Sequence, residues 1–333
     1  MQSILHPVIG PKKEIHDLNG RVALVVGGAM GIGFEVARAF VKVGARVIMV
    51  NRKEEQGDEA IKQIKDEVGP NAQIEWEGCD MGNLKQVKEV FTKIRERESR
   101  LDLLVLSAGI NVNQPGRTDD DIDRHFQVNW LGQFYVVNLL YPLLRKTSKL
   151  PDTPAPRIVF ESSEMHRTAP SNVHFGSLQE INNPEIGHTE VYGRTKLAII
   201  LGVKYGLVDR VIKPNNDNIY ALSVHPGAVN TAMQQQWKDA YPGLLGKVLT
   251  SVMLAGGRDV EQGSFSALWA ATSPEIEEKG YNGYYFSDVG QLGKESKQAS
   301  DPQLGAALWD LSLRMIKDKL GDDALADWTS TKE

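Results

Sequence analysis

The sequence predicts an α/β fold in which strands and helices alternate around one parallel sheet. Two observations carry this prediction. Short apolar runs recur along the chain, and most are followed by a segment with helical periodicity. A glycine turn that contains Gly27, Gly31 and Gly33 separates the first run, 22–26, from its helix. Over 333 residues we find no internal repeat and no clean linker, so a single domain is expected.

The glycine turn predicts a dinucleotide site. Glycine lacks a Cβ, so the backbone can take angles that other residues avoid and a pyrophosphate can approach the main chain. The helix behind the turn presents unpaired N–H groups and partial positive charge to such a ligand. The spacing is G-x-x-x-G-x-G rather than the G-x-G-x-x-G of the common fingerprint. A glycine-rich turn without a ligand is the alternative interpretation.

The remaining elements follow in order. Residues 1–20 lack periodicity and are expected to form an N-terminal arm over the domain. The expected strands after the first lie at 45–50, 73–79, 101–106, 157–160, 219–224 and 284–287. One expected helix ends near residue 68, three span 84–97, 119–146 and 260–271, and another begins near residue 191. A C-terminal amphipathic helix is expected around Leu308. The irregular stretch 164–190 is long enough to indicate a functional loop, and 230–257 resembles a mobile apolar flap.

Composition narrows the classes of partner. Thirty-eight basic and 43 acidic residues give a net charge of −5 without long like-charge blocks, so we expect no nucleic-acid or membrane-surface partner. The single cysteine, Cys79, excludes an internal disulfide and is expected to be a buried small side chain. The histidines show no metal-binding spacing, so no metal is expected. Without a signal-like segment or a long apolar run, we expect a cytoplasmic protein that lacks a membrane anchor.

The carboxyl ends of the predicted strands concentrate glycine and polar residues, and ligands of open parallel sheets bind at this edge. Tyr192 and Lys196 lie one helical turn apart and therefore share a face. A cation at that distance favours the phenolate and lowers the pKa of a tyrosine from its usual value of about 10 toward neutrality. The pair could then transfer a proton. By itself, tyrosine and lysine at this spacing is also typical of an amphipathic helix surface.

Several motifs taken together resemble the short-chain dehydrogenase/reductase family over residues 20–315. They are Gly27-x-x-x-Gly31-x-Gly33, Ala108-Gly109, Asn129, Ser163, Tyr192-x-x-x-Lys196 and Pro226-Gly227. The long gap between Ser163 and Tyr192 and the run His225-Pro226-Gly227-x-Val229-x-Thr231 are similar to its retinol-dehydrogenase-like branch, which includes many fungal oxidoreductases. The resemblance implies a single Rossmann-type doubly wound domain at 21–315, followed by a C-terminal tail at 316–333. It implies a seven-stranded parallel sheet in the order 3-2-1-4-5-6-7 flanked by helices.

The resemblance also implies catalytic roles. Tyr192 would donate a proton to a carbonyl oxygen, or accept it in the oxidation direction, and Lys196 would lower its pKa and hold the nicotinamide ribose. Ser163 would hydrogen-bond the substrate oxygen. It is chosen over the adjacent Ser162 from the family's pattern. Asn129 would bind a water in a proton relay.

The second strand's end predicts the choice of cofactor. A carboxylate there usually binds the ribose 2′-hydroxyl of NAD, whereas a 2′-phosphate needs positive charge. This chain has Asn51, Arg52 and Lys53, which favour NADP(H). The resemblance adds Asp80 and Met81 around the adenine, and Pro226, Gly227, Val229 and Thr231 around the nicotinamide amide. The remaining expected cofactor contacts are Gly27, Gly31, Ile32, Gly33, Ser107, Ala108, Gly109, Tyr192 and Lys196.

Two departures from the family pattern affect hydrogen bonds under the cofactor and no catalytic group. Val26 stands where threonine is usual, and Leu106-Ser107 stand where two asparagines are usual. His166 and Arg167 closely follow Ser163 and could touch the substrate.

We therefore predict an NADP(H)-dependent oxidoreductase of carbonyl-reductase type that interconverts a ketone or aldehyde and an alcohol on a lipophilic small molecule. The alternative is a descendant that binds NADP(H) without redox chemistry, as a sensor, a scaffold or a rearrangement enzyme. A homo-oligomer through the helices of Asn129 and Tyr192 is possible, unless the C-terminal extension covers that face.

Overall fold

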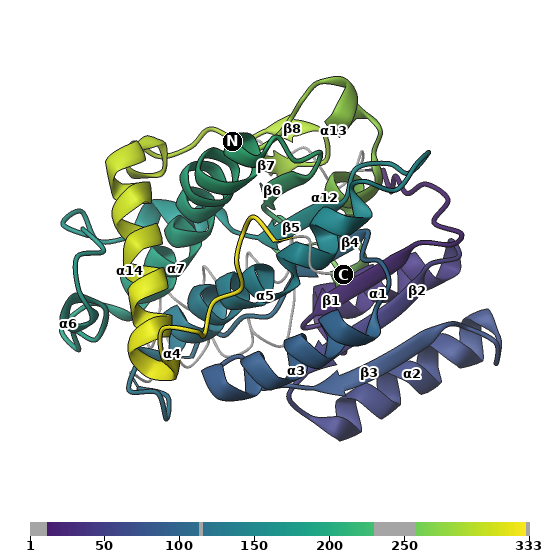
Figure 1. Cartoon of the computed structure of the whole chain (residues 1–333), viewed down its shortest axis with the longest axis horizontal. Helices are drawn as coiled ribbons and strands as arrows, with labels where there is room; N and C mark the ends of the chain where they lie inside the picture. Colours follow the sequence, from purple (N-terminus) through teal and green to yellow (C-terminus); the bar gives the residue numbers. More distant parts are fainter. Residues whose placement is uncertain (1–11, 113–115, 230–257, 331–333) are drawn as a thin grey trace.

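A computed structural model describes residues 12–112, 116–229 and 258–330. These residues form an eight-stranded sheet with helices on both faces (Figure 1). The strand order is β3-β2-β1-β4-β5-β6-β7-β8. The strands are β1 (Val22–Val26), β2 (Arg46–Asn51), β3 (Ile74–Gly78), β4 (Leu103–Leu106), β5 (Arg157–Glu161), β6 (Tyr220–Val224), β7 (Tyr285–Asp288) and β8 (Gln291–Leu292).

The first seven strands pair in parallel and in the predicted order, so the predicted α/β fold is confirmed. The predicted number of strands is corrected from seven to eight. After β7 the chain reverses at Gly290, whose φ is +62°, and β8 pairs antiparallel with β7. A two-residue strand is too short to leave a periodic pattern in the sequence.

Helices cover the sheet in two layers, each with its own apolar core. The helices are α1 (Gly31–Lys42), α2 (Glu54–Val68), α3 (Leu84–Arg97), α4 (Arg124–Phe126), α5 (Gly132–Thr147), α6 (Leu178–Ile181), α7 (His188–Leu201), α8 (Lys213–Asn215), α12 (Val260–Thr272), α13 (Glu275–Glu278) and α14 (Pro302–Leu320), with π-helical segments η1 (Gln127–Leu131) and η3 (Gly202–Ile212) and 3₁₀ turns η2 (Glu164–Thr168) and η4 (Gln298–Ser300). One core joins α1, α2 and α12 to the sheet through Phe40, Ile64 and Trp269. The other core joins α3, α5, α7 and α14 to the opposite face of the sheet.

The long helix predicted at 119–146 differs in the structure. It begins at Arg124, because the side chain of Asp123 caps it by accepting a hydrogen bond from the Phe126 amide at 2.9 Å. It then passes through the π-helical segment η1 before α5. Widened turns of this kind often occur at functional sites, and η1 contains Asn129.

Part of the predicted loop 164–190 is regular. It contains η2 and α6, and the helix that carries Tyr192 begins at His188, ahead of the expected start. The carboxylate of Glu190 accepts a hydrogen bond from the Gly187 amide at 3.2 Å, which fixes this earlier start. The predicted flap at 230–257, including Thr231, lies outside the described residues.

The C-terminal residues pack against the helices for which the sequence left two alternatives, an oligomer contact or a cover by the C-terminal extension. Helix α14, yellow in Figure 1, continues past residue 315 to Leu320 and contacts α7. The chain then returns over α5, where the hydroxyl of Tyr135 donates to the carbonyl of Ala324 at 2.7 Å and Asn138 donates to the carbonyl of Ala326 at 2.9 Å. The C-terminal segment therefore covers part of this face. Among the described helices, none has the length and apolar character needed to cross a membrane.

Candidate active site

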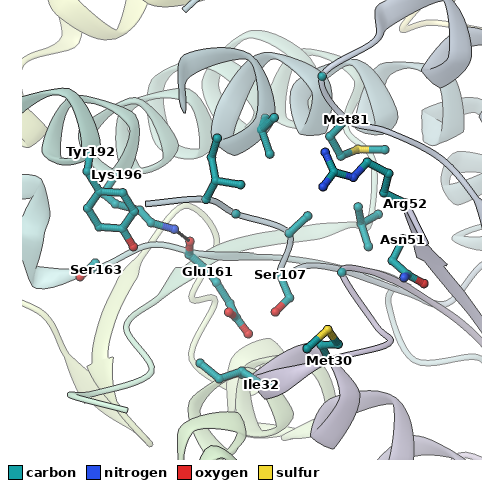
Figure 2. A pocket seen from close by; sticks show the side chains of 18 of the residues that line it. Met30, Ile32, Asn51, Arg52, Met81, Ser107, Glu161, Ser163, Tyr192 and Lys196 are labelled. Atoms are coloured by element: carbon teal, nitrogen blue, oxygen red, sulfur yellow. Dashed lines mark hydrogen bonds between the residues drawn. The ribbon is translucent and has the colours of Figure 1, made fainter. Parts of the chain in front are cut away.

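A cavity of about 1010 Å³ opens at the carboxyl edge of the sheet (Figure 2). Its walls come from the ends of β1 to β6 and from α7, so it lies where parallel sheets place their ligands. Most of the residues that the sequence predicts as catalytic or cofactor-binding line this cavity. They are Gly27, Gly31, Ile32, Asn51, Arg52, Lys53, Asp80, Met81, Ser107, Ala108, Gly109, Ser163, Tyr192, Lys196, Pro226, Gly227 and Val229. Gly33 and Asn129 lie behind this wall.

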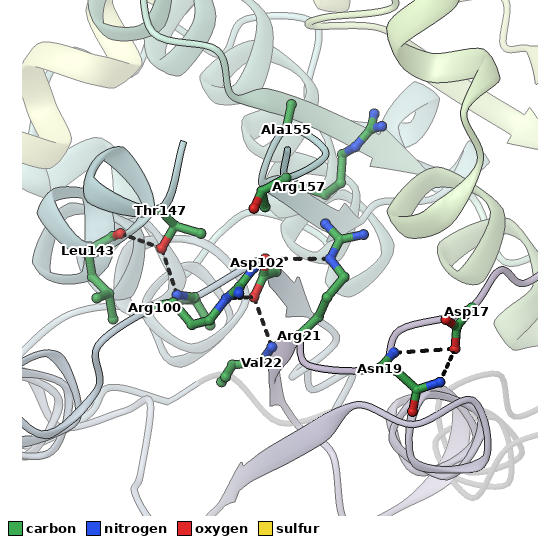
Figure 3. Close-up of polar contacts among 12 residues, drawn as sticks. Asp17, Asn19, Arg21, Val22, Arg100, Asp102, Leu143, Thr147, Ala155 and Arg157 are labelled. Carbon is green, nitrogen blue, oxygen red and sulfur yellow. Dashed lines mark hydrogen bonds and ion pairs between the residues drawn. The ribbon is translucent and has the colours of Figure 1, made fainter. Parts of the chain in front are cut away.

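At the opposite edge of the sheet, a buried carboxylate is paired with arginine side chains. Asp102, which is fully buried, accepts a hydrogen bond from the Val22 amide at 2.9 Å and pairs with Arg100 at 2.6 Å (Figure 3). Arg21 approaches the same carboxylate at 3.4 Å. The protein itself supplies all the partners of this carboxylate, so the Asp102 edge of the sheet is structural. The cavity edge, in contrast, is open to a ligand.

The glycine turn fits a dinucleotide because its glycines meet different steric requirements. Gly27 has φ +83°, and a Cβ there would lie 2.6 Å from the Ala108 nitrogen. A Cβ on Gly33 would collide with the carbonyl oxygen of Gly27. These two glycines let the turn pack against the end of β4. Gly31, with φ +58° and nothing within 4 Å of a built Cβ, leaves open space beside the N-terminus of α1 for a phosphate group.

The end of β2 presents cations and one amide. Asn51 is engaged inside the protein, since it accepts a hydrogen bond from the Trp76 indole and donates to the Lys53 carbonyl at 3.1 Å. The Arg52 side chain is 67% exposed and lies 3.6 Å from the carboxylate of Asp80, also at the cavity. An exposed pair at this distance is weak. The guanidinium is therefore available to an anionic ligand.

The proposed catalytic side chains lie at the other end of the cavity, as Figure 2 shows. Ser163 follows β5 and caps η2, with its hydroxyl oxygen accepting from the Met165 amide at 3.1 Å. Tyr192 and Lys196 come from α7, and the Lys196 ammonium lies 5.5 Å from the centre of the Tyr192 ring. Ser162 is buried and donates to the Lys196 carbonyl at 2.9 Å. The Ser162 hydroxyl is therefore engaged inside the protein.

His166 does not reach the cavity. It is fully buried, its Nδ1 lies 2.8 Å from the Ser163 carbonyl oxygen, and its Nε2 accepts from the Ser296 amide at 3.2 Å. Arg167 pairs with Glu164 at 2.8 Å. The hypothesis that His166 touches the substrate is therefore wrong, and the ring instead supports the backbone of Ser163.

Asn129 connects the end of β4 to the helix of Tyr192. Its side-chain oxygen accepts from the Ile110 amide at 2.7 Å, and its nitrogen donates to the Ile110 carbonyl at 2.9 Å and to the Thr195 hydroxyl at 3.2 Å. The side chain is fully buried. The structure thus gives Asn129 a bracing position, and its role in binding a relay water stays a prediction.

The electrostatics differ from the expectation for Tyr192. Burial and, second, the Glu161 carboxylate raise the pKa of Tyr192, so the expected lowering by Lys196 does not dominate. Burial lowers the pKa of Lys196, partly offset by Glu161. The phenol therefore keeps its proton and can donate it.

Glu161 was not identified from the sequence, although a charged residue directly after Ile158, Val159 and Phe160 was a usable signal. The described residues contain no group of three or more His, Cys, Asp or Glu that could hold a metal ion.

Comparison with known proteins identifies the family of the chain. The family described as short chain dehydrogenase matches residues 21–173. An uncharacterised oxidoreductase of Schizosaccharomyces pombe is 34% identical over 284 residues, covering 84% of this chain and 80% of that protein. A polyprenol dehydrogenase of Danio rerio is 29% identical over 307 residues, covering 91% and 89%. The solved structure of a short chain dehydrogenase from Pseudomonas syringae has a TM-score of 0.61 at 26% identity and covers 83% of this chain and 98% of its own. The chain belongs to the short-chain dehydrogenase family of oxidoreductases.

Proposed function

We propose that this protein is an NADP(H)-dependent oxidoreductase that interconverts a ketone or aldehyde and an alcohol on a lipophilic small molecule. One observation carries the proposal: Ser163, Tyr192 and Lys196 stand at one end of a cavity that the glycine turn also lines and that has Arg52 at its other end. We assign the chain to the retinol-dehydrogenase-like branch on the motifs described above.

The dinucleotide, when bound, supplies hydride transfer. Gly27, Gly31 and the N-terminus of α1 would hold its pyrophosphate, and Pro226 and Val229 would lie near its nicotinamide end. In reduction, the Tyr192 hydroxyl donates its proton to the carbonyl oxygen, while the Ser163 hydroxyl donates a hydrogen bond to the same oxygen. In oxidation, Tyr192 accepts the proton from the alcohol. The raised pKa of Tyr192 suits the acid role.

The choice of NADP(H) rests on charge. Arg52 and Lys53 both line the cavity where β2 ends, and the strand's last residue is Asn51 rather than a carboxylate. A guanidinium binds a 2′-phosphate through charge-assisted hydrogen bonds, whereas a carboxylate at Asn51 would repel it.

The lipophilic substrate is supported by two observations. Ile110 and Met165 line the catalytic part of the cavity and present apolar surface there. One relative is named for polyprenol, a long apolar alcohol. A hydrophobic substrate would gain affinity by burying its apolar surface against these side chains.

The test is NADPH consumption by the full chain against a panel of aliphatic aldehydes, quinones and lipophilic ketones, with NADH in parallel. We expect substrate-dependent consumption of NADPH that favours apolar carbonyl compounds over short polar ones. Tight NADPH binding without turnover of any compound would favour the alternative of a protein that binds NADP(H) without redox chemistry.

A further inference from the structure

Glu161 places a carboxyl group in the wall of the cavity. It is the last residue of β5, is only 8% exposed, and follows three apolar residues of a fully buried strand. In Figure 2 its side chain points toward Ser107 and Ile32, away from Tyr192. All four residues line the same cavity. A carboxyl group buried at this position has a high desolvation cost, so its presence calls for a role.

The protein satisfies this carboxyl group only in part. Burial raises the pKa of this carboxyl group and the nearby Ser107 side chain offsets this only in part, while its Oε1 is buried without any hydrogen-bond partner in the described structure. Lys196 donates to the main-chain carbonyl of Glu161 at 2.7 Å. No ion pair of the Glu161 carboxylate occurs among the described residues. A ligand with positive charge could therefore supply the missing partner.

The position of β5 relates Glu161 to one end of the expected dinucleotide. The adenosine end is expected at the ends of β2 and β3, beside Arg52 and Asp80. Three strand spacings, or about 14 Å, separate β2 from β5. The nicotinamide has to lie near Ser163 and Tyr192, because the reacting carbon of the substrate must contact both. Glu161 lies two residues before Ser163, and its carboxyl group acts electrostatically on both Tyr192 and Lys196, so it belongs to the nicotinamide end.

We propose that Glu161 makes the cavity bind the oxidised cofactor more tightly than the reduced one. This inference rests on the proposed function. The nicotinamide ring carries a positive charge only when oxidised, whereas the phosphate charges are the same in both forms. A carboxylate near the ring therefore changes the difference between the binding free energies of the oxidised and the reduced cofactor. At an effective dielectric constant of about 20, one charge several ångströms away changes an affinity by on the order of tenfold to hundredfold.

Burial and, second, the same carboxylate raise the pKa of Tyr192, which favours the protonated phenol that donates in reduction. Because the phosphate charges contribute equally to both dissociation constants, their ratio isolates the charge on the nicotinamide. Because burial raises the pKa of Glu161, the measurement belongs at about pH 8.5, where the carboxyl group is ionised.

Isothermal titration of NADP⁺ and of NADPH into wild type, Glu161→Gln and Glu161→Val tests the inference. Gln keeps the shape, and Val suits a buried strand if the polar variant does not fold. We expect the ratio Kd(NADPH)/Kd(NADP⁺) to fall about tenfold or more in both variants. Glu75→Gln, which removes the same charge from β3 at the far side of the sheet, should leave the ratio within about twofold.

The titrations have three outcomes that decide between these possibilities. A fallen ratio in a folded Glu161 variant, with the Glu75 control unchanged, supports the inference. Binding of both nucleotides with an unchanged ratio overturns it and leaves the proposed function intact. Failure of wild type to bind either nucleotide overturns the proposed function and the inference with it.

Discussion

The ammonium group of Lys196 donates a hydrogen bond to the main-chain carbonyl of Glu161, 2.7 Å away. This contact joins α7 to the end of β5, and the hydrogen bond from the Ser162 hydroxyl to the Lys196 carbonyl at 2.9 Å joins them a second time. The lysine is therefore held by the backbone of Glu161 rather than by its carboxylate. A change of the Glu161 side chain should alter the charge in the cavity and leave the lysine in place.

Removal of the Arg52 guanidinium should weaken NADPH binding about tenfold and NADH binding little, because only NADPH carries the 2′-phosphate. Fluorescence titration of both cofactors into Arg52→Ala measures this. The matched control is Lys62→Ala, an exposed cation on α2 paired with Asp66. Equal losses for both cofactors, or tighter wild-type binding of NADH than of NADPH, would show that Arg52 does not select the phosphate.

Acid should destabilise the fold through His125. Burial, chiefly, lowers the pKa of His125 from 6.5 to about 4, and its Nε2 accepts a hydrogen bond from the Val112 amide at 3.2 Å. The unfolded chain binds this proton more readily, so the stabilisation is complete above about pH 6.5 and is lost as the pH falls toward 4. The full effect is about 3 kcal/mol.

Urea unfolding at about pH 7.5 and pH 5 checks this. The drop in unfolding free energy should be smaller in His125→Gln than in wild type, whereas the exposed His174→Gln should behave as wild type. Because burial also lowers the pKa of His225, some acid sensitivity should remain in His125→Gln. An undiminished drop in that variant would assign the effect to other groups.

The C-terminal segment should stabilise the fold through Trp328. Its ring packs against Trp309, Tyr141 and Phe134, at centroid distances of 5.4, 5.3 and 6.1 Å. Trp328→Ala should cost about 2 to 3 kcal/mol, because it removes a half-buried aromatic side chain from this cluster. Trp328→Phe should lose less than half of that. Thermal or urea unfolding measures both, and equal stability of the alanine variant and wild type would mean that the segment adds nothing.

The sequence predicted the strand ends well because buried parallel strands have continuous apolar runs and their ends carry the unusual residues. Gly27, Ser107 and Tyr192 are far apart in the chain, and the order of the strands explains why they share one cavity. Gly33 lies behind the wall instead, since its role is the close approach to Gly27.

Features that depend on distant partners were not predictable. The π-helical segment around Asn129 coincides with side-chain hydrogen bonds to Ile110 and Thr195, which no local periodicity reveals. The direction of the Tyr192 pKa shift depends on burial and on Glu161, and the predicted strand at 157–160 stopped one residue before that carboxylate.

The central claim, that Tyr192 transfers the proton, is tested most directly by Tyr192→Phe, which removes one hydroxyl group. With a carbonyl compound that wild type reduces, we expect kcat to fall about 10²- to 10⁴-fold while the Kd of NADPH stays within about threefold. Tyr284→Phe, at a tyrosine that is 44% exposed, should retain wild-type kcat. A Tyr192→Phe variant whose kcat stays within a few-fold of wild type, at unchanged NADPH affinity, would contradict the assignment of Tyr192 as the proton donor.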